Sequence, residues 1–206
     1  MAAAMLIWPL ATGHGIRARL EQAWSTDRGY HDLRHLAEVL ERLVELGAGG
    51  DVEVVLAAWF HDAVHTGTPG GDDEERSAQL AIRELTPLSG VVNVAEVARL
   101  VRLTARHDPA PGDLRGAQLS DADLGILAAP SERYREYAAD VRREYAAVSD
   151  ADFARGRLEV LRKLAGRRHI FRTTYGRKHW EAAARANLAA EISDLEGACE
   201  DASPPR

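Results

Sequence analysis

The sequence predicts an all-α protein, a bundle of about seven to nine helices. Through most of the 206 residues, apolar side chains recur at intervals of three and four positions, which is the spacing of amphipathic helices. The alternation of apolar and polar residues that is typical of half-buried strands is scarce. Stretches rich in glycine and proline separate the periodic segments and predict the loops between helices.

The helices follow one another along the whole chain. Residues 30–46 carry leucine and valine on one side and run into the glycines of residues 47–50, which can end a helix. Asp51 can cap the next, very apolar helix, which reaches His61 and Asp62. The predicted helices cover residues 16–24, 30–46, 51–62, 74–85, 92–107, 120–129, 131–148, 149–164 and 179–198. The predicted loops are residues 66–73 and 108–116, both dense in turn residues.

The length suits one domain with a substantial core. We assign residues 1–15 to an N-terminal extension, residues 16–198 to the helical domain and residues 199–206 to a disordered tail. The apolar residues 1–10 are too few for a membrane span, and they lack the preceding positive charge of a signal peptide. A single cysteine, Cys199, excludes an internal disulfide. We therefore expect a cytoplasmic protein without a membrane partner.

The formal net charge of −6 gives the whole chain no attraction for nucleic acid, and no such partner is expected. One local exception lies in residues 162–178, where seven arginines and lysines occur without an acidic residue. This segment is either a solvated basic helix end and loop or a rim that attracts an anionic substrate.

Histidines and aspartates form three short motifs. His31 and His35 are four residues apart in a predicted helix, which would place both imidazoles on one face, one turn apart. His61 and Asp62 end the apolar helix, where burial would be costly unless a metal ion or hydrogen bonds neutralise them. Asp121 and Asp123 precede another apolar stretch. Each motif alone has an ordinary explanation, such as an acidic helix start for Asp121, but packing does not explain all three together.

The order His, then His-Asp, then Asp on successive helices resembles the HD superfamily of metal-dependent phosphohydrolases. More narrowly, the chain resembles a bacterial group of predicted metal-dependent HD phosphohydrolases, over stretches that span nearly the whole sequence. The matching stretches are RGYHDLRH, LAAWFHDAVH, DDEERSA, LTARH, SDADLGIL, YREYAADVRREY and EAAARANLAAEI. The resemblance implies an HD-domain helical bundle with a metal site at its centre.

The resemblance also implies a role for each motif. It makes His35, His61, Asp62 and Asp123 the metal ligands, with Asp123 preferred to Asp121 because the last ligand of the superfamily directly precedes the leucine-rich turn. The stretch around His31 is also similar to the YHNxxH motif of cyclic-nucleotide phosphodiesterases, in which the first histidine protonates the leaving oxygen. His31 is therefore the expected acid, although Asp32 stands where that motif has asparagine.

Three further residues have two interpretations each. Arg28 is either a bidentate clamp for a substrate phosphate or a surface cation. Glu74 either orients or deprotonates the attacking water or is an acidic residue in the first turn of a helix. His107 either binds substrate, supports the ligands or holds a second metal, or it is a cationic helix end. His65 is expected to form hydrogen bonds within its loop.

Two nitrogen and two carboxylate ligands suit a divalent Mn, Fe, Co, Ni, Zn or Mg ion and do not choose among them. The expected function is hydrolysis of a phosphate ester in a small phosphorylated molecule, with nucleotides among the candidates. The alternative is a metal- or nucleotide-binding regulatory module with little turnover. The sequence predicts neither the substrate nor the oligomeric state.

Overall fold

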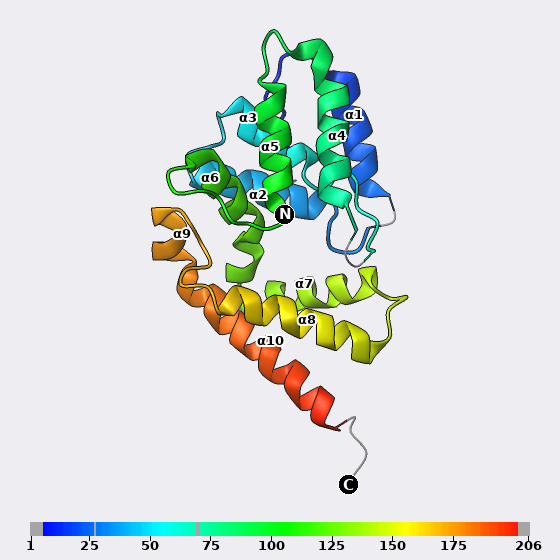
Figure 1. The fold of residues 1–206 in the computed structure, drawn as a ribbon, viewed down its shortest axis with the longest axis vertical. Coiled ribbons are helices and arrows are strands. Elements are labelled where there is room, and N and C mark those ends of the chain that lie inside the picture. Colours follow the sequence, from blue (N-terminus) through cyan, green and yellow to red (C-terminus); the bar gives the residue numbers. More distant parts are fainter. Residues whose placement is uncertain (1–5, 27, 69–70, 202–206) are drawn as a thin grey trace. The chain divides into compact units, whose positions relative to one another are not determined.

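The computed structural model describes residues 6–26, 28–68 and 71–201, and every regular element among them is a helix (Figure 1). The predicted all-α class is thereby confirmed. Contacts along the chain divide it into two compact units, Met1–Leu124 and Gly125–Arg206. The first unit contains α1 (His14–Ser25), α2 (Leu33–Glu45), α3 (Val52–Phe60), α4 (Asp73–Leu85), the 3-10 helix η1 (Thr86–Leu88), α5 (Val94–Thr104) and α6 (Leu114–Asp123). The 3-10 helix η2 (Leu124–Ala128) follows, and then α7 (Ser131–Glu144), α8 (Asp150–Ala165), α9 (Thr174–His179) and α10 (Glu181–Asp201).

Helix α3 is the centre of the first unit. Its residues from Val54 to Phe60 are all buried, as expected of a helix that is apolar on every side. Helices α2, α4, α5 and α6 all contact it. Asp51 caps α3 as predicted, since its carboxylate accepts a hydrogen bond from the Val54 N–H. Because His61 and Asp62 directly follow this helix, its packing fixes where they lie.

In the second unit, α8 and α10 pack against each other (Figure 1). Their contact includes a buried polar network, in which the Arg157 guanidinium binds the Glu191 carboxylate at 2.7 Å and the Tyr137 hydroxyl at 3.1 Å. The Tyr134 hydroxyl donates to Glu191 as well. These hydrogen bonds satisfy the buried polar groups, which would otherwise destabilise the fold.

Helix α2 begins later than predicted. The carboxylate of Asp32 accepts hydrogen bonds from the N–H groups of Arg34 and His35, which makes Asp32 the N-cap and Leu33 the first helical residue. His31 therefore precedes the helix. The prediction that His31 and His35 share one helical face, one turn apart, is wrong.

Helix α6 begins earlier than predicted, at Leu114 within the expected loop 108–116. Asp113 caps it through the Gly116 N–H at 2.9 Å. Gly116 is a packing residue, because a Cβ atom there would lie 2.8 Å from the Cδ1 of Leu103 and would also clash with the Asp113 side chain. Asp121 and Asp123 consequently lie at the C-terminal end of α6, and the interpretation of Asp121 as an acidic helix start is wrong.

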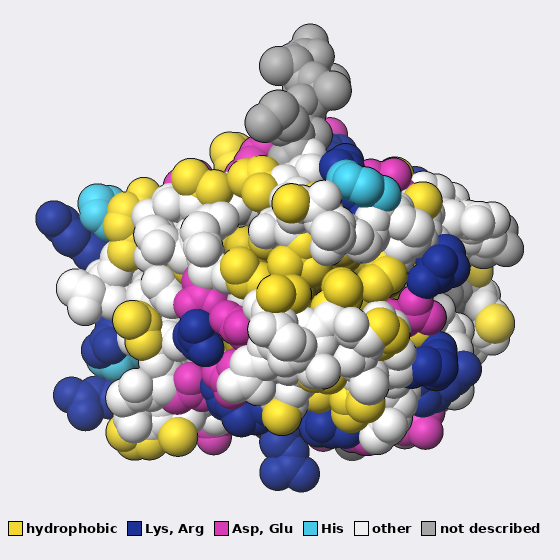
Figure 2. Space-filling model, turned by 90° about the horizontal axis from the view of Figure 1, so that it is seen from above, with side chains coloured by type: hydrophobic (Ala, Val, Ile, Leu, Met, Phe, Trp, Pro, Cys, Tyr) yellow, Lys and Arg dark blue, Asp and Glu magenta, His cyan; other side chains and the backbone are white. Residues whose placement is uncertain are grey.

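The remaining boundaries differ by smaller amounts. The short helix α9 was not predicted, and α10 continues to Asp201, into the expected tail. Residues 1–5 of the N-terminal extension and 202–206 of the tail lie outside the described residues, as do residues 69–70 of the loop 66–73. Across the described residues, no helix is both long and apolar enough to cross a membrane. Figure 2 shows one face, on which hydrophobic side chains gather among charged ones, as on many protein surfaces.

Two neighbouring residues of α2 test the core. Leu43 is fully buried, whereas Val44 is 53% exposed. We expect Leu43→Ala to lower the free energy of unfolding by about 2–5 kcal/mol through lost burial and a residual cavity. Val44→Ala should change it by less than about 0.5 kcal/mol. Urea denaturation of both variants measures the difference, and equal effects would contradict this packing of α2.

Candidate metal centre

Four side chains from three separate segments converge in the first unit. His35 lies in the first turn of α2, His61 and Asp62 follow α3, and Asp123 ends α6. The Nε2 atoms of the two histidines are 3.2 Å apart. Asp62 Oδ2 lies 3.1 Å from His61 Nε2 and 3.7 Å from His35 Nε2. Asp123 Oδ1 lies 3.3 Å from His35 Nε2 and 3.6 Å from His61 Nε2. The four residues predicted as ligands thus lie together.

Hydrogen bonding determines which nitrogen of His61 is available. Its Nδ1 lies 2.7 Å from the carbonyl oxygen of Ala58, and because a carbonyl only accepts, Nδ1 must carry the proton. In the neutral ring, Nε2 then carries no proton, and its lone pair is directed at the cluster. A hydrogen bond from the second ring nitrogen to a carbonyl is the usual way in which proteins orient a metal-binding histidine.

The two imidazoles form the closed side of the cluster, and the carboxylates form the open side. The side chains of His35 and His61 are each 1% exposed, whereas those of Asp62 and Asp123 are 18% and 14% exposed. The cluster therefore holds two almost inaccessible nitrogens and two carboxylates that solvent can reach.

The pKa shifts follow from burial and from the neighbouring charges. Burial would raise the pKa of Asp62 and that of Asp123, but the charge of His61, together with neighbouring histidines and hydrogen bonds, outweighs burial and lowers both. Burial lowers the pKa of His35, and Asp123 only partly offsets this. Burial also acts to lower the pKa of His61, but Asp62 and Asp123 raise it well above its ordinary value. The aspartates are thus ionised, and without a metal ion they favour the protonated form of His61. A metal ion would take the place of that proton, and the two carboxylates with two neutral imidazoles would then offer it two negative charges.

This donor set fits a divalent cation in charge and in size. Burying two carboxylates without a counter-charge is costly, and a divalent ion would neutralise them. Metal–nitrogen and metal–oxygen bonds of about 2.0–2.2 Å imply separations between neighbouring donor atoms of about 2.8–3.6 Å. The histidine–histidine and histidine–carboxylate distances above, 3.1–3.7 Å, agree with such a cage to within about 0.1 Å. His35, His61 and Asp62 each offer one ligand atom, and these three atoms all lie within 4.8 Å of one another.

Trp24 lies against the two buried imidazoles, a contact that the motifs did not predict. Its ring centroid is 6.0 Å from that of His35 and 5.4 Å from that of His61. The indole N–H donates to the carbonyl of Trp59 at 3.0 Å, which fixes the ring. Its place at the end of the predicted helix 16–24 did not indicate that it lies beside the site.

Arg28 binds backbone carbonyls beside the cluster. Its guanidinium donates to the carbonyl oxygens of Ala23 at 3.1 Å, His31 at 3.1 Å, Asp62 at 2.9 Å and Ala63 at 3.2 Å. It also lies over the ring of Trp24. These contacts make Arg28 a positioning residue for the backbone beside the cluster, whereas phosphate binding by Arg28 stays a prediction. A lone arginine before a histidine motif carries no signal that its partners are carbonyls distant in sequence.

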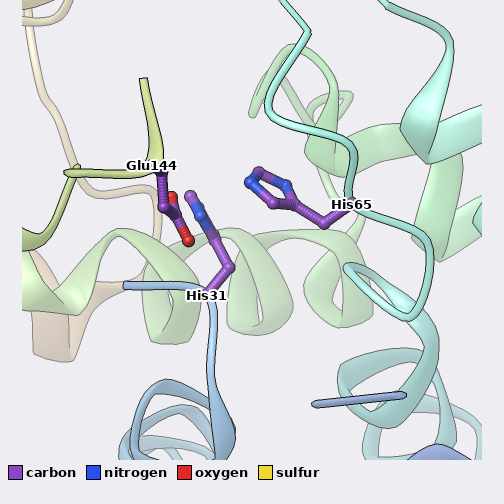
Figure 3. Close-up of side chains that lie close together, drawn as sticks. All are labelled: His31, His65 and Glu144. Atoms are coloured by element: carbon purple, nitrogen blue, oxygen red, sulfur yellow. The ribbon is translucent and has the colours of Figure 1, made fainter. Parts of the chain in front are cut away.

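His31 lies beside the cluster and next to His65. The ring centroids of His31 and His35 are 5.6 Å apart, and those of His31 and His65 are 4.2 Å apart at an interplanar angle of 35°. Figure 3 shows these two imidazoles lying close together. The pairing brings His65 near the site, whereas the sequence suggested only hydrogen bonds within a loop.

His107 lies on the other side of Asp123. Its Nε2 is 3.6 Å from Asp123 Oδ2, and its Nδ1 is 3.3 Å from the Ser120 hydroxyl. His107 has a φ of 48°, and among the described residues it is the one non-glycine residue with a positive φ. His107 follows the end of α5, where a left-handed residue often closes a helix, and holding this conformation costs on the order of 1 kcal/mol. The position fits the predicted supporting role, whereas substrate binding by His107 stays a prediction.

Glu74 and Asp121 are less closely tied to the cluster. Glu74 is half-buried in the first turn of α4, and no contact recorded among the described residues joins it to the ligands. Its role with water stays a prediction. Asp121 is fully buried near the end of α6, and Asp123 is the carboxylate whose Oδ1 faces both histidines.

Comparisons with known proteins add no relative, since no family model, curated protein or solved structure matches this chain. The resemblance to HD phosphohydrolases therefore rests on the motifs, and the candidate site rests on the geometry above.

Arg28 provides a test of this geometry. We expect Arg28→Met to lower the free energy of unfolding by about 2 kcal/mol or more, because backbone carbonyls lose charged hydrogen-bond donors. The matched control is Arg83→Met, whose side chain is 67% exposed and whose loss should cost less than about 0.5 kcal/mol. Urea denaturation measures both. An unchanged stability for Arg28→Met would contradict the positioning role of Arg28.

Proposed function

We propose that this protein is a metal-dependent phosphohydrolase that cleaves a phosphate ester in a small molecule, with nucleotides among the candidate substrates. One observation carries the proposal: two histidine Nε2 atoms and two carboxylate oxygens converge from three segments with separations of 3.1–3.7 Å. Two imidazole nitrogens that face each other beside two carboxylates favour a cation between them. The resemblance of the motifs to HD phosphohydrolases supplies the class of reaction.

His35, His61, Asp62 and Asp123 would hold the ion. A divalent ion bound by these side chains supplies Lewis-acid chemistry, acidifying water and polarising a phosphate oxygen. The protein's own contribution is to exclude water from the imidazole side and to leave the carboxylate side open. The Ala58 carbonyl keeps the His61 ring in the orientation that directs Nε2 inward.

His31 is the proposed proton donor to the leaving oxygen. It precedes α2 and is partly exposed, so that it can both meet a substrate and exchange protons with solvent. Arg28 binds the carbonyl of His31 and that of Asp62, which sets the acid at a fixed place relative to the ligands. A positioned acid of this kind typically contributes a factor of about 10²–10⁴ to the rate.

Binding of a divalent ion is the first test. For the metal-free protein, we expect Mn²⁺, Co²⁺, Ni²⁺ or Zn²⁺ at about 100 times its dissociation constant to raise the melting temperature by about 5 °C or more, because the ion binds the folded state. His61→Ala and Asp62→Asn should each lose this rise.

The controls for metal binding are His14→Ala and Asp72→Asn, since both residues are exposed. Each control should keep the rise in melting temperature. A wild-type protein that gains no stability from any of these ions, and contains none by elemental analysis, would rule out the metal centre.

Turnover is the second test. With Mn²⁺ or Co²⁺ bound, we expect the protein to release phosphate from at least one member of a panel of nucleotides and sugar phosphates. His31→Ala should lower kcat by about 10²–10⁴ and keep the metal-induced rise in melting temperature, whereas Asp62→Asn should lose both. If the ion binds and no ester in the panel is hydrolysed, the chain is a metal-binding module and the hydrolase proposal fails.

A further inference from the structure

The second unit contains a basic segment, residues 162–178, which the proposed function does not use. It carries seven arginines and lysines and no acidic residue, in a chain whose net charge is −6, so the other residues carry a net charge of −13. The segment comprises the end of α8, the connection that follows it, and most of α9. The positive charge of the chain is therefore unusually concentrated here.

The backbone of this basic segment is held in place by α10. The Arg185 guanidinium donates to the carbonyl oxygens of Ala165 at 3.0 Å, Arg167 at 2.9 Å and Arg168 at 3.2 Å. The Glu181 carboxylate accepts hydrogen bonds from the N–H groups of Ile170 at 3.1 Å and Phe171 at 3.2 Å. These contacts fix the connection before any ligand arrives, which lowers the entropic cost of binding.

An aromatic pair lies beside the cations of this basic segment. The exposed rings of Tyr175 and His179 contact each other in a tilted arrangement, with centroids 4.4 Å apart at an interplanar angle of 35°. Tyr175 is 38% exposed, and Trp180 braces it with an edge contact at 5.5 Å. Arg177 and Lys178 are exposed on the same short helix, α9. An accessible ring thus lies next to positive charges on a fixed backbone.

We propose that this surface binds single-stranded nucleic acid. Exposed Arg and Lys side chains would meet the phosphates, and the Tyr175 ring would stack on a base, which is the combination used for single strands without sequence preference. A membrane is less suited, because Ile170 and Phe171, the apolar residues at the middle of the segment, are buried and cannot insert. An acidic protein would use the charges but would not need the aromatic pair.

This inference revises the expectation of no nucleic-acid partner, which rested on the charge of the whole chain. Salt screens exposed charges over about 10 Å at 0.1 M ionic strength. A local group of cations therefore acts on a nearby phosphate chain even though the chain as a whole is acidic. The inference does not depend on the proposed hydrolase activity.

Fluorescence anisotropy of the full chain with a labelled 20-nucleotide oligo-dT tests the proposal. We expect binding to the single strand that is tighter than to a duplex of equal length and that weakens as salt rises. The double variant Arg177→Gln/Lys178→Gln should bind more weakly and lower the slope of log affinity against log salt by about 1.4. Tyr175→Ala should weaken binding about tenfold, whereas Tyr175→Phe, which keeps the ring, should bind as the wild type does.

The matched control is Arg19→Gln/Arg83→Gln, which removes two cations that are 62% and 67% exposed in the first unit. It should leave binding unchanged, and melting temperatures should show that all variants are folded. Failure to bind oligo-dT at about 50 mM salt would overturn the proposal. So would a control that weakens binding equally, or a Tyr175→Ala variant that binds like the wild type. Equal binding to anionic vesicles would indicate a membrane surface and overturn it too.

Discussion

The guanidinium of Arg28 joins parts of the chain that the candidate metal centre needs in fixed positions. It binds carbonyl oxygens at the end of α1, ahead of α2 and after α3. A backbone that turns sharply after a helix leaves carbonyls without helical partners, and one planar side chain with five donors can satisfy several of them. His31, His61 and Asp62 all lie within one residue of a carbonyl so bound. The site therefore depends on an interaction that contributes no ligand itself.

The sequence predicted the elements better than their ends. Apolar periodicity correctly indicated helices through most of the described residues. The family resemblance of the His and Asp motifs selected His35, His61, Asp62 and Asp123, and these four side chains do lie together. The predicted starts of α2 and α6 were wrong because of helix capping. Asp32 and Asp113 each accept hydrogen bonds from backbone N–H groups, and these bonds determine where α2 and α6 begin. The partners of Arg28 and the pairing of His31 with His65 could not be predicted, because they join residues whose proximity arises only when the helices pack.

Charge is distributed on two scales in this protein. The candidate metal centre concentrates two carboxylates beside buried imidazoles, where a low dielectric strengthens each interaction and favours a compact, doubly charged cation. The basic segment spreads its cations over an exposed surface, where water weakens each contact and an extended anion gains from several at once. The net charge of −6 describes neither, and so a single value for the whole chain was a poor guide to its ligands.

Gly116 has a consequence for Asp123, at the opposite end of α6. Ten residues of helix span about 15 Å, and the helix is rigid on that scale. Because Gly116 has no Cβ, the start of α6 can approach Leu103 of α5. A larger residue at this position would push the start of α6 away from α5. Because the helix is rigid, the Asp123 carboxylate at its other end would move as well. Close packing at one glycine thus sets the direction of a side chain about two turns away. The geometry of the metal centre depends partly on a residue that does not contact it.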